Sequence, residues 1–173
     1  MPDNDSALGR VRAMSADDVM TVFAWRNHPD IRRSMFSQHE IGIEEHRRWF
    51  DTQSQDPRRH LLIYEQADAP MGFVALTQAA RGQVADWGFY TAPGAPKGTG
   101  RAMGRCALEH AFVRLGLHKV CGQAIEFNRR SIGFHLALGF RQEGFLRDQH
   151  FDGERYHGVA CFGLLQHEWP PAA

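Results

Sequence analysis

The segment Ala95-Pro96-Lys97-Gly98-Thr99-Gly100-Arg101 lies between a strand-like stretch, 84–91, and a helical stretch that follows it. Glycines at 98 and 100 permit backbone angles closed to other residues and let a ligand approach the peptide amides closely. The first amides of the following helix have no partner inside it, and the helix dipole adds partial positive charge there. The sequence therefore predicts an anion-binding turn at a helix start.

Phosphate is the usual anion at such a turn, and the surrounding charge agrees, since residues 87–108 contain no Asp or Glu whereas Lys97 and Arg101 are basic. A Walker loop places Lys and Ser/Thr after its last glycine, but Arg101 and Ala102 follow here. A dinucleotide fingerprint needs a third glycine three residues after the second, and Gly104 comes four residues on. Coenzyme A remains among the common diphosphate cofactors, although an ordinary helix start explains the loop alone equally well.

Composition places the chain among ordinary globular proteins. A length of 173 residues suits one domain, 1–173, and hydrophobic residues make up 43% of it. A formal net charge of zero gives no broad attraction to nucleic acid or to a membrane surface. The polar start, 1–6, and the absence of a long apolar run predict no signal peptide and no membrane span, hence a cytoplasmic protein.

Cysteine and histidine usage gives no sign of a disulfide framework or of a metal. Cys106, Cys121 and Cys161 fall inside apolar helix or strand patterns and predict buried, reduced thiols. The ten histidines occur in no His-Glu-x-x-His or paired Cys/His spacing, so we expect no metal site.

Hydrophobic periodicity predicts an α/β (α+β) domain with a mixed, mostly antiparallel sheet of about seven strands and helices on both faces. Helices are expected over 15–28, 31–36, 41–53, 95–116 and 129–138, and strands over 8–14, 60–66, 70–77, 84–91, 119–127, 140–151 and 156–166. Short links predict an antiparallel meander from 60 to 91. The helical crossover makes 119–127 parallel to 84–91, and Asp152-Gly153 predicts a hairpin.

Two motifs, Gly98-Thr99-Gly100 in the turn described above and the segment from Asn128 to Phe140, resemble those of the GNAT superfamily of acetyl-CoA-dependent N-acetyltransferases. The family pattern has Gln or Arg, two residues, Gly, one residue, then Gly or Ala. Here Gly98 and Gly100 match, and Ala95 stands at the first position. The second pattern, Asn-x-x-Ala/Ser with an aromatic seven residues after the Asn and then Gly-Phe, resembles Asn128-Arg129-Arg130-Ser131-Ile132-Gly133-Phe134-His135-Leu136-Ala137-Leu138-Gly139-Phe140. The resemblance covers nearly the whole chain and implies a GNAT-like fold with a splayed parallel strand pair.

Segments within residues 25–50, together with residues 126–128, are similar to the sugar-nucleotide N-acetyltransferase branch of the pseudaminic acid pathway. The similarity lies in Trp25-Arg26-Asn27-His28-Pro29, Ile31-Arg32, Met35-Phe36, His46 with Trp49-Phe50, and Glu126-Phe127-Asn128. It implies transfer of acetyl to a primary amine of an amino-deoxysugar nucleotide. Acetyltransferases of protein N-termini share parts of this pattern, so a protein N-terminus or a polyamine is the alternative acceptor.

The resemblance also implies which residues hold acetyl-CoA. The pantetheine arm would lie between strands 84–91 and 119–127, and the diphosphate would meet amides at the helix start. The residues implied are Phe89, Tyr90, Thr91, Lys97, Gly98, Thr99, Gly100, Arg101, Ala102, Met103, Asn128, Ser131 and His135. Capping of the next helix would equally explain Asn128.

Three groups are implied for catalysis. The amide near Tyr90 would stabilise the oxyanion, and His135, which stands where the family usually has Tyr, would protonate the leaving thiolate. Many members carry a carboxylate five residues before the Asn, but that position is Gln123 here. Glu126 and Asp86 are the nearby candidates for a base, and deprotonation through water without a dedicated base stays open.

For the acceptor we expect a small-molecule amine in a pocket formed by Arg26, Met35, His46, Phe50 and Tyr90. Apolar side chains suit a deoxysugar, and Arg26 suits a nucleotide phosphate. A catalytically silent CoA-binding module is the alternative from another class. A homodimer is compatible with the sequence.

Overall fold

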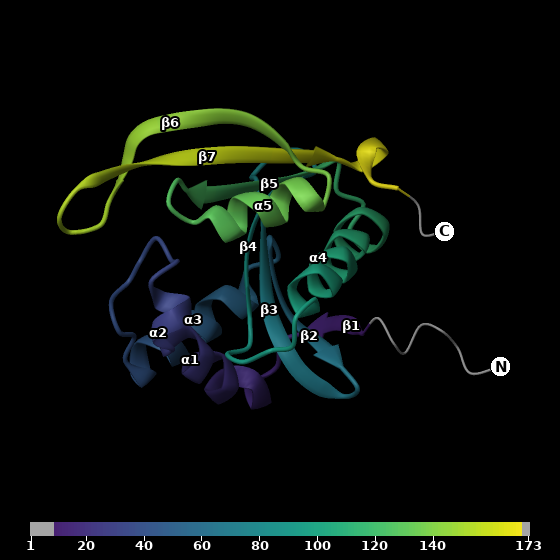
Figure 1. Ribbon diagram of the computed structural model, residues 1–173. Coiled ribbons are helices and arrows are strands. Elements are labelled where there is room, and N and C mark those ends of the chain that lie inside the picture. Colours follow the sequence, from purple (N-terminus) through teal and green to yellow (C-terminus); the bar gives the residue numbers. More distant parts are fainter. Residues whose placement is uncertain (1–8, 171–173) are drawn as a thin grey trace.

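Seven strands form one sheet in the computed structural model, which describes residues 9–170 (Figure 1). Their order is β1-β2-β3-β4-β5-β7-β6. The strands are β1 (Arg10–Ala13), β2 (Arg59–Gln66), β3 (Ala69–Gln78), β4 (Val84–Thr91), β5 (Lys119–Ile125), β6 (Arg141–Phe151) and β7 (Tyr156–Leu165). The helices are α1 (Val19–Asn27), α2 (Pro29–Arg32), α3 (Ile43–Gln55), α4 (Thr99–Glu109) and α5 (Arg129–Ala137).

All neighbouring strands are antiparallel except β4 and β5, which confirms the predicted meander and the predicted parallel crossover. The β4–β5 ladder is short, because it holds only Val84↔Lys119, Ala85↔Val120 and Asp86↔Cys121. Beyond Asp86, β4 stays paired with β3, and β5 stays paired with β7. The two strands diverge there (Figure 1), so the predicted splayed pair is present.

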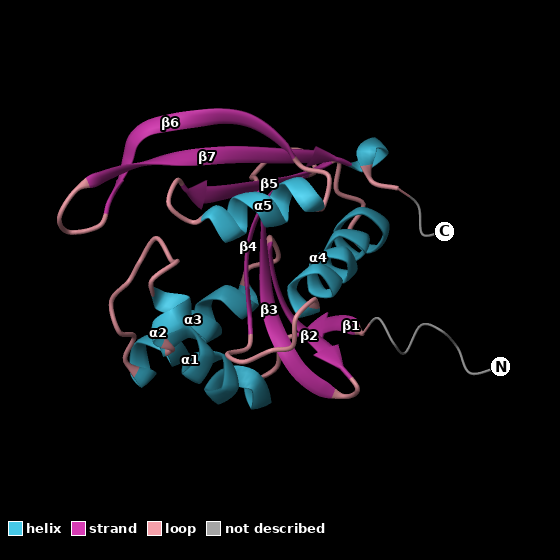
Figure 2. Ribbon diagram, in the orientation of Figure 1, coloured by secondary structure: helices cyan, strands magenta, loops and turns pink. Residues whose placement is uncertain are grey.

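Two hydrophobic cores lie on opposite faces of the sheet. Figure 2 shows the helices that pack on the sheet. The larger joins the sheet to α4 and α5, with Met103, Leu108 and Phe140 among its buried residues. The smaller packs Val22 of α1 against Ile63 and Phe73 of the sheet, and Trp49 of α3 covers it. Helices therefore cover both faces, as the sequence predicts, and α1–α3 stand on the side away from α4.

Several boundaries differ from the predicted ones. The expected helix over 31–36 is instead α2, one turn starting at Pro29, because proline suits the first helical position and the His28 side chain accepts a hydrogen bond from Asp30 N–H. The α4 helix ends at Glu109 and continues as a wider π-type turn to Arg114. The expected start of the first strand at Leu8 lies outside the described residues.

The cysteines correct one expectation. All three are free thiols, but each is partly exposed, whereas the sequence predicts burial. Cys121 and Cys161 are partly exposed because they lie on the neighbouring strands β5 and β7 and face the same side of the sheet. Cys121 lines a cavity, and the thiol of Cys161 accepts a hydrogen bond from Gln123.

Within residues 9–170, no group of three or more His, Cys, Asp or Glu side chains is arranged to hold a metal ion. None of the helices described there has the length and apolar character needed to cross a bilayer.

A buried ion network fixes β1 to β2 and to the start of α1. The Arg12 guanidinium donates to Asp18 at 2.7 and 2.8 Å and to Glu65 at 2.7 Å, and Arg10 adds a second contact to Glu65 at 3.0 Å. Asp18 and Glu65 are each only 7% exposed. The hydrogen bonds from Arg12 hold the pKa of both carboxyl groups below the usual range.

We expect Arg12→Ala to lower the free energy of unfolding by about 2 kcal/mol at pH 7, because two buried carboxylates lose their main donor. The effect stays below that of a fully buried pair, since the Arg12 side chain is 34% exposed. Because the folded-state pKa values are lowered, the stabilisation is present above about pH 4 and is lost as the pH falls further.

Denaturant unfolding at pH 7 and pH 3 measures both effects. Arg58→Ala, which breaks an exposed pair with Asp56, is the control and should change stability by less than about 0.5 kcal/mol. Equal effects of the two substitutions would contradict the role given to the buried network.

Candidate active site

A cavity of about 700 Å³ opens where β4 and β5 part. Its wall is formed by 86–91 of β4, 121–125 of β5, Asp30, Ile31 and 34–36 at α2, Gly98, Gly100, Arg101 and Met103 at α4, and Asn128, Arg130, Ser131 and Phe134 at α5. The strand edges that face the gap have no ladder partner across it, so backbone N–H and C=O groups there are free to bind a ligand. A cavity of this size suits an extended cofactor together with a small acceptor.

The start of α4 has the properties expected of a diphosphate site. Gly98 caps the helix with φ +96°, a conformation that L side chains rarely adopt. The first turn holds no acidic residue, and Arg101 lines the cavity beside it. Thr99 is 4% exposed, and its buried Oγ1 finds no hydrogen-bond partner in the described part of the chain. Free amides, a nearby cation and an unsatisfied hydroxyl fit a polyanionic cofactor.

The structure brings most of the expected cofactor residues together. Those that line the cavity are Phe89, Tyr90, Thr91, Gly98, Gly100, Arg101, Met103, Asn128 and Ser131. Lys97, Thr99, Ala102 and His135 are not among the lining residues. Thr99 and His135 are absent from the cavity wall because both residues are buried.

Asn128 stands at the start of α5. Its Oδ1 accepts a hydrogen bond from the Ser131 N–H at 3.1 Å, which is an N-cap. Both residues nevertheless line the cavity, so the cap and a cofactor contact are compatible.

His135 occupies a different environment from the one expected of an exposed acid. It is 1% exposed, and burial lowers its pKa. Its Nε2 accepts a hydrogen bond from the Trp87 indole N–H at 3.0 Å, and its Nδ1 lies 2.8 Å from the Ser131 carbonyl oxygen. Both ring nitrogens are therefore already engaged, so protonation of a thiolate by His135 stays a hypothesis that this geometry does not favour.

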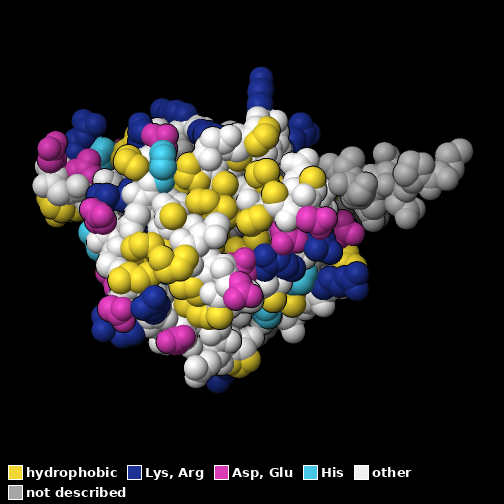
Figure 3. Space-filling model, turned by 90° about the horizontal axis from the view of Figure 1, so that it is seen from below, with side chains coloured by type: hydrophobic (Ala, Val, Ile, Leu, Met, Phe, Trp, Pro, Cys, Tyr) yellow, Lys and Arg dark blue, Asp and Glu magenta, His cyan; other side chains and the backbone are white. Residues whose placement is uncertain are grey.

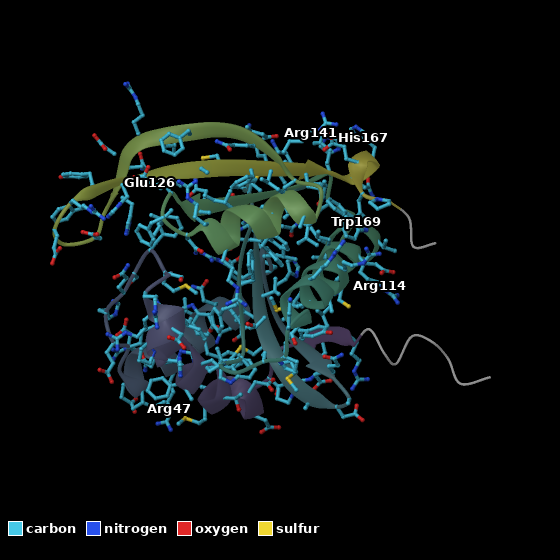
Figure 4. The ribbon with its side chains drawn as sticks, viewed as in Figure 1. Arg47, Arg114, Glu126, Arg141, His167 and Trp169 are labelled. Atoms are coloured by element: carbon cyan, nitrogen blue, oxygen red, sulfur yellow. The ribbon has the colours of Figure 1, made fainter. Side chains whose placement is uncertain are left out.

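The two candidate bases lie in different places. Asp86 is exposed, lines the cavity at the last β4–β5 pair and forms no ion pair with any residue from 9 to 170. Glu126 lies beyond the end of β5 near the β6–β7 hairpin (Figure 4) and does not line the cavity. One of its carboxylate oxygens accepts the Gly158 N–H at 2.9 Å and faces His157. Asp86 is thus the better placed of the two.

Ile31, Met35 and Phe36, which lie in and after α2, line the cavity, as does Tyr90. Burial raises the pKa of Tyr90, and the positive charge of Arg26 acts on it in the opposite direction. Arg26 does not line the cavity. It donates to the Ser37 carbonyl oxygen at 2.6 Å, while its other terminal nitrogen is buried without a partner among the described residues.

Of the five expected acceptor residues, only Met35 and Tyr90 line the cavity. His46 is 3% exposed because it faces inward from α3, where its Nε2 lies 3.0 Å from the Val19 carbonyl oxygen. Phe50 packs against the smaller core. Helical spacing alone does not separate a face toward the sheet from a face toward a pocket, and here the inward face is structural.

Sequence reasoning missed several wall residues, above all Trp87, Gly122 and Phe36. The Phe36 ring contacts His150 of β6 edge-to-face with centroids 5.4 Å apart, which joins the segment after α2 to the β6–β7 hairpin. No local motif marks this long-range contact. For Gly122 a signal existed, namely a glycine inside a strand, which often marks a close approach.

Comparison with known proteins agrees with this geometry. Residues 10–141 match the family described as the acetyltransferase (GNAT) domain, so the chain belongs to the GNAT acetyltransferase family. Among relatives, acetyltransferase PseH of Campylobacter jejuni is 27% identical over 69% of this chain and 74% of that protein. The SPbeta prophage-derived uncharacterized N-acetyltransferase YokL of Bacillus subtilis is 27% identical over 92% of this chain and 90% of its own.

Solved structures agree on the fold. The spermidine N-acetyltransferase from Vibrio cholerae in complex with CoA and spermine has a TM-score of 0.86, 23% identity, and covers 93% of this chain and 97% of its own. The protein is therefore an acetyltransferase that uses acetyl-CoA, with the GNAT fold predicted from its sequence.

We expect Gly98→Ala to weaken CoA binding about tenfold, because an L side chain strains the left-handed turn and displaces the amides at the α4 start. Gly94→Ala is a matched control. Gly94 has φ +73° in the same loop, open space around it and no place in the cavity wall. Calorimetric titration with CoA measures both affinities. The site assignment would be contradicted by equal losses in the two variants.

Proposed function

We propose that this acetyltransferase moves acetyl from acetyl-CoA directly to a primary amine of an amino-deoxysugar nucleotide. Similarity to the acetyltransferase PseH and the resemblance of segments within residues 25–50 to the sugar-nucleotide branch support this acceptor class. The single observation that carries it is the apolar lining by Ile31, Met35 and Phe36, together with the positive charge of Arg26, which lies outside the wall but acts on the wall residue Tyr90.

This apolar lining suits a sugar face better than a polycation. Ile31, Met35 and Phe36 offer apolar surface to a deoxysugar methyl group. Asp30, one of two carboxylates in the wall, is paired with Arg33. Arg26 lies outside the cavity wall, but one of its terminal nitrogens is buried without a partner among the described residues, so a phosphate or carboxylate of the acceptor that reached it would form a charge-assisted bond.

Acetyl-CoA supplies the acyl group as a reactive thioester, and the residues of this chain bind and orient the reactants. Amides at 98–103 would hold the diphosphate, and the free edge of β4 would bind the pantetheine arm. Asp86 would take a proton from the substrate ammonium, directly or through one water, so that the neutral amine can attack the thioester carbonyl carbon. As the C–S bond breaks, the second proton lost by the nitrogen would pass through water to the leaving thiolate. The backbone N–H near Tyr90 stabilises the negative charge that develops on the carbonyl oxygen.

A polyamine is the second candidate acceptor. The spermidine N-acetyltransferase of Vibrio cholerae shares the fold, and Asp30 and Asp86 could attract an ammonium group. Charge on the surface does not choose between the two, because basic and acidic side chains are interspersed around the face seen in Figure 3. The remaining alternatives are acetyl transfer to a protein N-terminus and a CoA-binding module without catalytic activity.

The decisive experiment measures release of free thiol from acetyl-CoA with a panel of amines. The panel contains a nucleotide-linked amino-deoxysugar, spermidine, and a peptide with a free N-terminus. We expect kcat/KM for the sugar nucleotide to exceed that for spermidine by at least about 100-fold, as unpaired charge in the wrong site costs several kcal/mol. Preference for spermidine would overturn the sugar assignment, and no turnover with any amine would favour the silent module.

A substitution tests the role of the buried cation. Arg26→Met keeps the length of the side chain and removes its charge, so KM for an anionic acceptor should rise about tenfold through loss of a charge-assisted interaction. KM for acetyl-CoA should stay unchanged. Arg48→Met, on the exposed face of α3, is the matched control. An unchanged acceptor KM in Arg26→Met would remove Arg26 from recognition.

A further inference from the structure

The apex of the β4–β5 splay is filled by two aromatic rings. The ladder ends at Asp86↔Cys121, so the next residues on the two strands are Trp87 and Gly122, and both line the cavity. Trp87 is 7% exposed and His135 is 1% exposed. The rings meet edge-to-face with centroids 5.7 Å apart, and His135 stacks at 4.8 Å on Phe162 of β7. The cavity floor is therefore a packed aromatic cluster.

Gly122 shows how tightly the pair is seated. A Cβ on this residue would collide with His135 Nε2 and would lie 2.7 Å from Trp87 Nε1. The hydrogen bond between the two rings thus lies directly against the backbone of β5. Any larger residue at 122 would displace either β5 or the ring pair.

The tautomer of His135 follows from its partners. An indole N–H only donates, so Nε2, at 3.0 Å from Trp87 Nε1, has to be the unprotonated acceptor. The ring proton then sits on Nδ1 and is donated to the Ser131 carbonyl oxygen at 2.8 Å. A general acid needs the opposite, a proton directed at the reacting sulfur. In this geometry His135 accepts a hydrogen bond from Trp87.

We propose that His135 is a positioning residue that anchors Trp87 through this hydrogen bond and so fixes the strand β4 at the point where it leaves β5. Trp87 directly precedes the β4 segment 88–91 whose backbone faces the gap. A shift of the indole moves that segment, and displacement of about 1 Å in a reacting pair can cost about 100-fold in rate. This inference rests on acetyl transfer in this cavity, with whichever amine the enzyme accepts.

Two substitutions at 135 separate an acceptor from an acid. His135→Leu removes the acceptor, and His135→Gln places an amide oxygen near the Nε2 position but has no proton to give to a thiolate. We expect kcat to fall about tenfold or more in His135→Leu and to recover to within about threefold of wild type in His135→Gln. If His135 is the acid, both variants lose activity equally, and that result would overturn the proposal.

A double-mutant cycle tests the partnership itself. Trp87→Phe keeps an aromatic ring but loses the N–H, so its kcat should fall to about the level of His135→Leu, and the double variant should be no slower than either single one. Multiplying losses would mean that the two residues act independently and would also overturn the proposal. Trp169→Phe is the matched control, because Trp169 lies at the far end of the chain near α4 (Figure 4) and should leave kcat unchanged.

The readouts keep this proposal apart from the function on which it rests. Thermal unfolding and CoA titration identify any variant that fails to fold, and Trp87→Phe still tests the hydrogen bond if His135→Leu fails. Thiol release by the wild type with an accepted amine establishes acetyl transfer. A silent wild type would refute the function, whereas an active wild type with equal losses in His135→Leu and His135→Gln refutes only the positioning role.

Discussion

The parting of β4 from β5 after three residue pairs is the constraint on which the rest of the molecule depends. Each strand keeps its outer neighbour, β3 or β7, so the sheet stays continuous while the two inner edges lose their partners. Unpaired backbone groups inside a protein are costly, and such an edge is stable only where water or a ligand satisfies it. The splay therefore leaves backbone groups that water or a ligand has to satisfy, and residues of both α4 and α5 line the cavity there.

The sequence predicted that the residues expected to hold the cofactor would lie around one cavity, and most of them do, because their signals are local. Gly98 and Gly100 lie in the turn at the start of α4, and Asn128 and Ser131 form the cap of α5. Residues this close in sequence are also close in the structure, so a motif is enough to place them. The strands and the Asp152-Gly153 hairpin were predictable for the same reason, since period-two patterns and turn residues act over a few positions.

The acceptor half could not be predicted in the same way, because its walls come from segments far apart in the chain. His46 and Phe50 have the spacing of a pocket face, yet tertiary packing turns that face toward the smaller core. Phe36 lines the cavity from the segment after α2, and its ring contacts His150 of β6, a strand far away in the sequence. Position within a motif points to His135 as an acid, but whether a ring nitrogen is free depends on Trp87, which lies 48 positions away.

A crystal structure of the protein with bound CoA tests the central claim most directly. The diphosphate should lie within hydrogen-bond distance of the backbone amides of residues 98–103, and the pantetheine arm should run between β4 and β5 with the aromatic floor in place beneath it. A complex in which CoA occupies another surface, or in which the gap between the two strands holds no part of it, would contradict the assignment of this splay as the acetyl-transfer site.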